Sequence, residues 1–152
     1  MTLAPERIPA GAGAEVLHRN GNRVLYTDGS YDQGVAGWAV VENGSILLQD
    51  WSRGLTSNLA EGFAILGAVK LIGKKPQGIV VTDSLAWADC LNRGRTMKGK
   101  GHKSLLEDIY DHMNEDTYFH WVPGHSGDYG NELADMYAKQ ARLERISRRF
   151  RN

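Results

Sequence analysis

Four acidic side chains occur where the sequence could place them for chemistry. Asp28 and Asp83 each follow a short apolar run, "VLYT" and "IVVT", that is typical of a β-strand. Glu61 and Asp135 fall in the first turns of two expected helices. Because sites in sheets with parallel strands collect at the carboxyl ends of the strands, all four carboxylates could meet at one edge of a sheet.

Each of the four acids also has an explanation that needs no chemistry. Asp28 can favour an Asp-Gly turn with Gly29, and Glu61 can complete a capping box begun by Asn58. Asp83 can cap the helix that follows it, and Asp135 can form an exposed ion pair with Lys139. Taken one at a time, the explanation for Asp28 is as good as a functional one, and those for Glu61, Asp83 and Asp135 are better.

A shared site for four carboxylates would need cations. Without them the carboxylates repel one another, which raises their pKa values. A hard divalent cation removes that penalty, and Mg²⁺ typically uses a few carboxylates together with waters and substrate phosphate oxygens. Two such ions can promote hydrolysis of a phosphodiester. Considered jointly, the four acids therefore indicate a two-metal nuclease site.

The elements that would position these acids follow from the hydrophobic pattern. Three β-type runs, with the turn signal Asn43-Gly44 between the second and third, predict an antiparallel meander. Helical spacing and short apolar runs then predict alternating helices and parallel strands. The expected strands are 23–30, 34–43, 45–54, 78–83 and 118–123, and the expected helices are 57–72, 84–92, 103–113 and from 131 onward. This order predicts an α/β fold, a five-stranded mixed sheet (antiparallel meander plus parallel strands) flanked by helices.

Composition narrows the class of protein. The chain has 152 residues, which is about one domain, and equal numbers of basic and acidic side chains, so net charge predicts neither a nucleic acid nor a membrane as partner. Its single cysteine, Cys90, excludes an intramolecular disulfide and fits a reducing compartment. No apolar run reaches the length of a membrane span. We expect a cytoplasmic protein.

Four motifs together resemble those of type 1 ribonuclease H, the endonuclease that cuts the RNA strand of an RNA/DNA hybrid. They are "YTDGS" around Asp28, "TSNLAE" ending at Glu61, "VTDS" around Asp83, and "VPGHSGDYGNELAD" ending at Asp135. The last is the most specific, because it joins a histidine, a glycine-rich loop and the spacing Asn-Glu-x-x-Asp. The resemblance covers residues 23–141, which we expect to form the ribonuclease H domain. Residues 1–22 would be a poorly ordered lead-in and residues 142–152 an arginine-rich tail.

The resemblance implies a mechanism and a set of residues for it. Asp28, Glu61, Asp83 and Asp135 would be catalytic and would bind two Mg²⁺ ions, with Mn²⁺ as a possible substitute. The products would carry 5′-phosphate and 3′-hydroxyl ends. His125 matches the family's histidine on a mobile loop, which is thought to help protons move and product leave. The alternative for His125 is a plain turn residue between glycines.

The resemblance also implies contacts with the substrate. Thr56 and Asn58 match positions that contact phosphate and the minor groove, although both could equally serve to cap the helix that carries Glu61. The turn after Asp28 is shorter than in many bacterial members, which leaves Ser30 and Gln33 as candidates for one contact. Many bacterial members also have an extra helix and a basic protrusion that grips the DNA strand. The segment "NRGRTMKGKGHK" leaves no room for one, so the chain resembles the variants without a protrusion.

Two cationic segments could replace the missing protrusion by contacting phosphates. One is the loop with Arg93, Arg95, Lys98, Lys100 and Lys103, and the other is the tail with Arg142, Arg145, Arg148, Arg149 and Arg151. For the tail, the alternative is that its arginines only complement the dipole at a helix C-terminus.

Other classes of function remain alternatives to a monomeric enzyme that acts on RNA/DNA hybrids and binds no membrane. One is a domain of the same fold that binds hybrids without cutting them. Another is a related nuclease that needs a partner, for example a polymerase-like protein. The presence of all four acids favours the enzyme.

The tail provides a first prediction. Removal of the residues from Arg142 onward should raise the KM for hybrid at moderate salt, because each phosphate contact makes binding more salt dependent through counterion release. Steady-state kinetics at several salt concentrations would measure this. An unchanged KM with an unchanged salt dependence would contradict phosphate contact by the tail.

Overall fold

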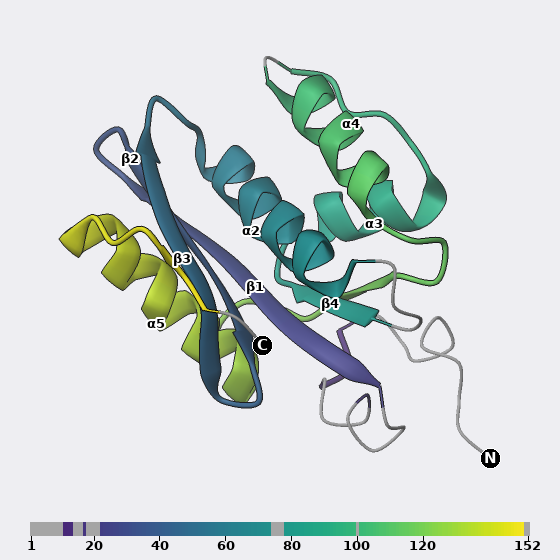
Figure 1. Ribbon diagram of the computed structural model, residues 1–152, viewed down its shortest axis with the longest axis horizontal. Coiled ribbons are helices and arrows are strands. Elements are labelled where there is room, and N and C mark those ends of the chain that lie inside the picture. Colours follow the sequence, from purple (N-terminus) through teal and green to yellow (C-terminus); the bar gives the residue numbers. More distant parts are fainter. Residues whose placement is uncertain (1–10, 14–16, 18–21, 74–77, 100, 151–152) are drawn as a thin grey trace.

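The computed structural model describes residues 11–13, 17, 22–73, 78–99 and 101–150. A mixed sheet forms the centre, with α2, α3 and α4 on one face and α5 on the other (Figure 1). The strands are β1 (Arg23–Asp32), β2 (Val35–Glu42), β3 (Ser45–Arg53), β4 (Gly78–Thr82), β5 (Tyr118–Trp121) and β6 (Arg148–Arg149), and the helices are α2 (Ser57–Ile72), α3 (Leu85–Arg93), α4 (His102–His112) and α5 (Tyr129–Glu144). The expected α/β class and its order of elements are confirmed.

The sheet has six strands in the described part of the chain, in the order β5-β4-β1-β2-β3-β6. The meander β1-β2-β3 is antiparallel, whereas β4 pairs parallel with both β1 and β5. The expectation of five strands was therefore wrong. The sixth, β6, pairs antiparallel with Leu48 and Gln49 of β3. Two arginines carry no alternating apolar pattern, so the sequence does not reveal this strand.

The sheet is buried on both faces, and this explains why its strands read as nearly continuous apolar runs. On β1, Leu25 belongs to the core cluster under α2, whereas Val24 and Tyr26 belong to the cluster under α5. The same alternation separates Val80 from Val81 on β4. Most of the lead-in 1–22 lies outside the described residues. Its described part contacts β5, where the N–H of Gly11 donates to the carbonyl of Trp121 at 2.8 Å.

Helix starts in the structure differ from those that the sequence suggested. Thr56 caps α2 by accepting a hydrogen bond from the N–H of Leu59, so Glu61 is not part of a capping box with Asn58. Ser84, and not Asp83, caps α3.

The last helix is capped by Asp128 and begins two residues before the expected Asn131. In β1 the chain runs on as a strand through Asp28 and Gly29 to Asp32, so the Asp-Gly turn considered as the alternative role of Asp28 is not formed. Asp28, Glu61 and Asp83 thus lack the local roles that would explain them without chemistry.

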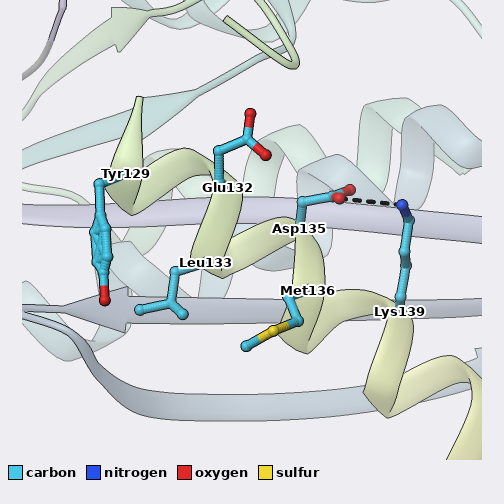
Figure 2. A pocket seen from close by; sticks show the side chains of 6 residues that line it. All are labelled: Tyr129, Glu132, Leu133, Asp135, Met136 and Lys139. Carbon is cyan, nitrogen blue, oxygen red and sulfur yellow. Dashed lines mark ion pairs between the residues drawn. The ribbon is translucent and has the colours of Figure 1, made fainter. Parts of the chain in front are cut away.

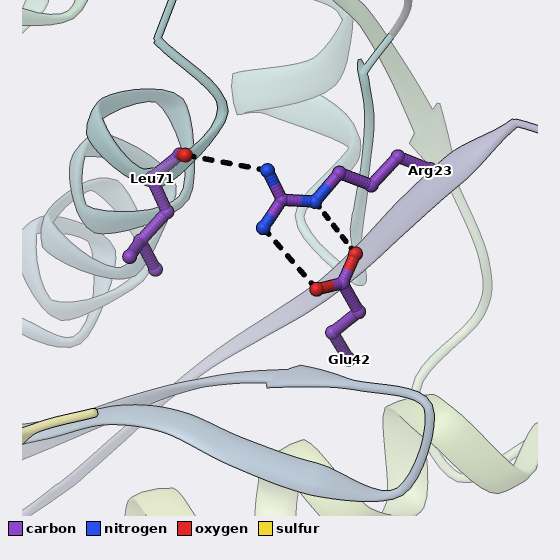
Figure 3. Close-up of polar contacts among 3 residues, drawn as sticks. All are labelled: Arg23, Glu42 and Leu71. Atoms are coloured by element: carbon purple, nitrogen blue, oxygen red, sulfur yellow. Dashed lines mark hydrogen bonds and ion pairs between the residues drawn. The ribbon is translucent and has the colours of Figure 1, made fainter. Parts of the chain in front are cut away.

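A part-buried ion pair fastens three elements at the end of the sheet where β1 begins (Figure 3). The guanidinium of Arg23 donates to both carboxylate oxygens of Glu42, at 2.7 and 3.2 Å, and to the carbonyl of Leu71 at 3.3 Å. These residues belong to the start of β1, the end of β2 and the last turn of α2. Bidentate pairing of this kind fixes geometry as well as adding energy.

Gly29 determines how closely α2 approaches β1. A Cβ at this position would lie 2.6 Å from the backbone nitrogen of Glu61 and 2.7 Å from the carbonyl carbon of Ala60. Its φ is not in the left-handed region, so glycine is required here for space and not for a turn. The contact brings the first turns of α2, and with them Glu61, against the strand that carries Asp28.

We predict that Gly29→Ala destabilises the protein by about 1–3 kcal/mol, the usual cost of overpacking, because the groups in its way are backbone atoms that cannot rotate aside. Gly67→Ala is the matched control. Gly67 is buried within α2, and the nearest atom to its added Cβ would be a Leu48 methyl at 3.2 Å, a side-chain group that can move. Since alanine favours helix by roughly 0.5–1 kcal/mol over glycine, this variant should lose little stability or gain some. Urea denaturation of both variants would test the pair, and equal losses would contradict the close-approach explanation.

Candidate active site

Two carboxylates are brought together by the register of the parallel strand pair. Tyr26 of β1 is the partner of Val81 of β4, and Asp28 and Asp83 each lie two residues further along their strands. β4 ends at Thr82, so Asp83 stands at the carboxyl end of its strand, beside the continuing β1. This is the position at which the sequence predicted that acids would collect.

Glu61 of α2 completes a group of three acids. Carboxylate oxygens of Asp28, Glu61 and Asp83 all lie within 4.8 Å of one another. Asp28 is 2% exposed, whereas the other two are half-buried. Oε2 of Glu61 is buried and has no hydrogen-bond partner among the described residues. An unpartnered buried carboxylate oxygen is costly, so the group has unused binding capacity.

The three carboxylates oppose one another electrostatically. Burial is the largest cause that raises the pKa of Asp28, and the charges of Glu61 and Asp83 raise it further. Burial and the charge of Asp83 raise the pKa of Glu61 to about 8. Burial also raises the pKa of Asp83, although hydrogen bonding with Asp28 lowers it in part. Each shift means that the ionised form is disfavoured until a positive charge arrives.

These observations fit a hard divalent cation. The three side chains of the group offer carboxylate oxygens, which suit hard cations such as Mg²⁺ or Mn²⁺. The orphaned oxygen of Glu61 and the raised pKa values both describe a site that a cation would stabilise. Asp28, Glu61 and Asp83 are the residues that would hold it.

Asp135, the fourth predicted acid, lies beside this group but outside its set of mutually close oxygens. Its charge raises the pKa of Asp83, and a hydrogen bond with it raises the pKa of Asp28. Figure 2 shows that Asp135 pairs with Lys139 one turn further along α5, with Oδ2 and Nζ 3.1 Å apart. The ion pair expected from the sequence is therefore present. This ion pair does not prevent Asp135 from lying close to the other acids.

The pair of Asp135 and Lys139 lines a pocket on the outer side of α5 (Figure 2). The pocket has a volume of about 460 Å³, and the other residues that line it are Tyr129, Glu132, Leu133 and Met136. Tyr129 and Met136 are largely exposed. No sequence motif predicts this pocket, because its residues alternate between apolar and charged within one helix.

His125 lies in the loop between β5 and α5, next to Asp83. It is exposed and has a φ of 57°, in the left-handed region. A Cβ on the neighbouring Gly124 would be 3.2 Å from Oδ2 of Asp83. The charge of His125 lowers the pKa of Asp83, which offsets part of the rise due to burial. The loop thus places an imidazole at the edge of the acidic group.

The predicted substrate contacts differ in how available their side chains are. Thr56 is exposed, although its hydroxyl accepts the capping hydrogen bond. Asn58 is half-buried and bonds to His102. Ser30 is 9% exposed, and its hydroxyl accepts a hydrogen bond from Nε of Arg142 on α5. Gln33 is exposed in the turn between β1 and β2.

The cationic loop joins α3 and α4 over residues 94–101, and its described part contains no helix. Arg93 and Arg95 share Asp89, at 2.7 and 3.9 Å, so part of their charge is neutralised. Lys98 is exposed and makes no ion pair within the described ranges. Lys100, also predicted to contact substrate, lies outside the described residues.

Several arginines of the tail bind other parts of the fold. The guanidinium of Arg145 lies 5.5 Å from the centre of the Trp51 ring. Nε of Arg148 donates to Oε1 of the fully buried Gln49 at 2.8 Å. Deleting the tail from Arg142 would therefore remove structural contacts as well as charge. Substitution of the exposed Arg149 by Gln tests the charge alone.

None of the helices in the described ranges is long and apolar enough to cross a membrane.

Comparison with known proteins places these features in a family. The sequence model described as RNase H matches residues 20–142. The Pol polyprotein of Equine infectious anemia virus (strain Wyoming) is 32% identical over 117 residues, which is 76% of this chain, and the chain spans only 10% of that polyprotein's length. A ribonuclease H of Acidovorax sp. (strain JS42) is 30% identical over 136 residues, which cover 77% of this chain and 92% of the relative. A ribonuclease H of Ruthia magnifica subsp. Calyptogena magnifica is 29% identical over 149 residues, 82% of this chain and 97% of the relative.

The electrostatics of the acidic group predict how stability depends on pH. Folding raises the pKa of Asp28 and Glu61, so above about pH 4 the metal-free folded chain binds more protons than the unfolded chain. Its stability should then fall as pH rises toward the folded pKa of Glu61, about 8. Thermal melting in EDTA should show this fall, and Mg²⁺ should reverse it by binding the folded state.

Asp28→Asn should melt higher than wild type in EDTA at pH 8 and should gain less from Mg²⁺. Asp111→Asn, an exposed change on α4, is the matched control and should behave as wild type. An equal response of both variants to Mg²⁺ would argue against a cation at this site.

Proposed function

The chain belongs to the RNase H family, and on that basis we propose that it is an endoribonuclease that hydrolyses the RNA strand of RNA/DNA hybrids. The observation that carries the proposal is the convergence of Asp28, Glu61 and Asp83, whose oxygens lie within 4.8 Å of one another at the end of the parallel strands. Three mutually repelling carboxylates are poorly explained as a structural feature. They are well explained as ligands for cations that work on a phosphodiester.

In this proposal the three acids hold Mg²⁺, with Mn²⁺ as a possible substitute, and Asp135 completes a site for two ions. When bound, the ions supply Lewis-acid stabilisation of the charges on the attacking and leaving oxygens. Asp28 lies in the centre of the acids and is the most buried of them, so its contribution is to fix their mutual position. The proposed products carry 5′-phosphate and 3′-hydroxyl ends.

His125 is proposed to move protons and to assist product release. Its place beside Asp83 on an exposed loop supports this role, because the imidazole can reach both the acidic group and solvent.

Substrate binding is proposed to use polar side chains at the start of α2 and cations of the loop before α4. Thr56 is exposed and Asn58 is half-buried at the end of α2 nearest Glu61. Lys98 is an exposed cation on the loop, and Arg93 and Arg95 retain partial exposure despite Asp89. Phosphate contacts from such groups position a nucleic acid without reading its sequence.

The alternative is a domain that binds hybrid without cutting it, or a nuclease that is active only with a partner. The similarity to part of a Pol polyprotein supports the idea of a polymerase-like partner. We favour an active monomer because the acidic group is complete within one chain. A cytoplasmic setting is supported by the single free, buried Cys90.

Cleavage of a labelled RNA/DNA hybrid in Mg²⁺ tests the proposal. The wild-type chain should cut the RNA strand, and Asp83→Asn, which keeps the size and removes the charge, should lower kcat by on the order of 100-fold or more. Asp111→Asn should cut as wild type does. Duplex DNA and duplex RNA of the same sequence should be poor substrates.

The outcomes separate the alternatives. Binding of hybrid without cutting, by the wild type and by Asp83→Asn, would favour the binding domain or a requirement for a partner. Cutting that survives Asp83→Asn unchanged would place the chemistry elsewhere on the molecule.

A further inference from the structure

His102, the first residue of α4, makes a hydrogen bond to a predicted substrate-binding residue of another helix. Its Nε2 lies 3.1 Å from Oδ1 of Asn58, near the start of α2. No sequence motif singles out His102, because His102 and Asn58 are far apart in the chain. The contact joins the loop that carries the basic side chains to the helix that carries Glu61.

The ring of His102 is held in place by its surroundings. It stacks on the fully buried indole of Trp87, with ring centres 6.2 Å apart and planes at 21°. The same indole donates from Nε1 to the backbone carbonyl of Asn58 at 2.9 Å. Behind the ring, a Cβ at Gly99 would come within 2.7 Å of Nδ1 of His102, so glycine leaves room for the imidazole.

The direction of the hydrogen bond follows from the chemistry of the two groups. A carboxamide oxygen can only accept, so Nε2 of His102 must carry the proton and donate it. The amide of Asn58 is then fixed with its oxygen toward α4. Its NH₂ group makes no hydrogen bond to the described residues and is left as a donor.

We propose that His102 is a positioning residue that orients the Asn58 amide so that it presents its NH₂ group to the minor groove of the hybrid. The inference rests on the proposed function. Acceptors in that groove are base atoms and the 2′-hydroxyl, which marks the RNA strand. An amide free to rotate would present its oxygen to the same acceptors part of the time. Holding the NH₂ group of Asn58 toward the 2′-hydroxyl therefore favours the hybrid over duplex DNA, which has no 2′-hydroxyl.

Paired substitutions at His102 test this role. His102→Phe keeps an aromatic ring for stacking on Trp87 and removes the donor. His102→Gln keeps a side-chain N–H that can reach Asn58. We expect His102→Phe to raise the KM for hybrid about five- to tenfold, the value of roughly one hydrogen bond, with kcat within about twofold of wild type. His102→Gln should restore most of the KM.

Two further measurements separate positioning from other roles of the histidine. In the Asn58→Ala background, His102→Phe should change KM by less than about twofold, whereas a direct contact of His102 with phosphate would still be lost in full. His102→Phe should also discriminate less between hybrid and duplex DNA. With duplex DNA as a competitor, the ratio of the inhibition constant of the DNA to the KM for hybrid should fall. His102→Met, which also lacks a donor, replaces the Phe variant should that variant melt below the assay temperature.

The results distinguish failure of the inference from failure of the proposed function. A wild-type chain that neither cuts nor binds hybrid would overturn both. A wild-type chain that cuts hybrid, together with an unchanged KM in His102→Phe, would overturn the positioning role alone. Full additivity of His102→Phe and Asn58→Ala would also overturn it, because it would mean that the two residues act independently.

Discussion

Mutual repulsion among carboxylates held near one another is the constraint around which this molecule is arranged. Asp28, Glu61 and Asp83 come from a central strand, a covering helix and the end of a second strand, and burial disfavours the charge of each. Hydrogen bonds within the acidic group, such as that between Asp28 and Asp83, offset this cost only in part. The main attraction comes from the apolar surface buried on both faces of the sheet, which is the dominant favourable contribution to folding.

Contacts beside the acids and at the far end of the same elements hold β1 and α2 together against this repulsion. Close to them, the absence of a side chain at Gly29 lets the start of α2 pack directly against β1, which places Glu61 beside Asp28. At the other end of the same strand and helix, Arg23 binds Glu42 and the carbonyl of Leu71. The two elements are thus fixed at both ends, and a cation is free to act on geometry that already exists. Preformed geometry of this kind is what electrostatic catalysis requires.

Sequence reasoning found the acids but misjudged the reasons for several of their neighbours. Two apolar runs, each followed by an acid, were enough to predict that Asp28 and Asp83 would lie close together, although β1 continues past Asp28 to Asp32 instead of ending there. Gly29 was interpreted as a turn residue, since a sequence cannot show that a helix from another part of the chain passes within van der Waals distance of it. The strand β6 carries no periodic signal in two arginines. The contact between His102 and Asn58 depends on how two helices pack, and packing of non-local segments has no short motif.

The two arginines of β6 also affect how the molecule meets copies of itself. Without them, β3 would be the last strand of the sheet, with a row of backbone donors and acceptors open to any extended chain. The final segment occupies this row, and the N–H of Phe150 extends the pairing to the carbonyl of Leu47. The outer edge of β6 is very short and carries two positive charges. A strand of another molecule can therefore form few hydrogen bonds there, and the β6 of a second copy is repelled by the like charge. Pairing with β6 thereby lowers the tendency of β3 to pair with a strand of another copy of this chain.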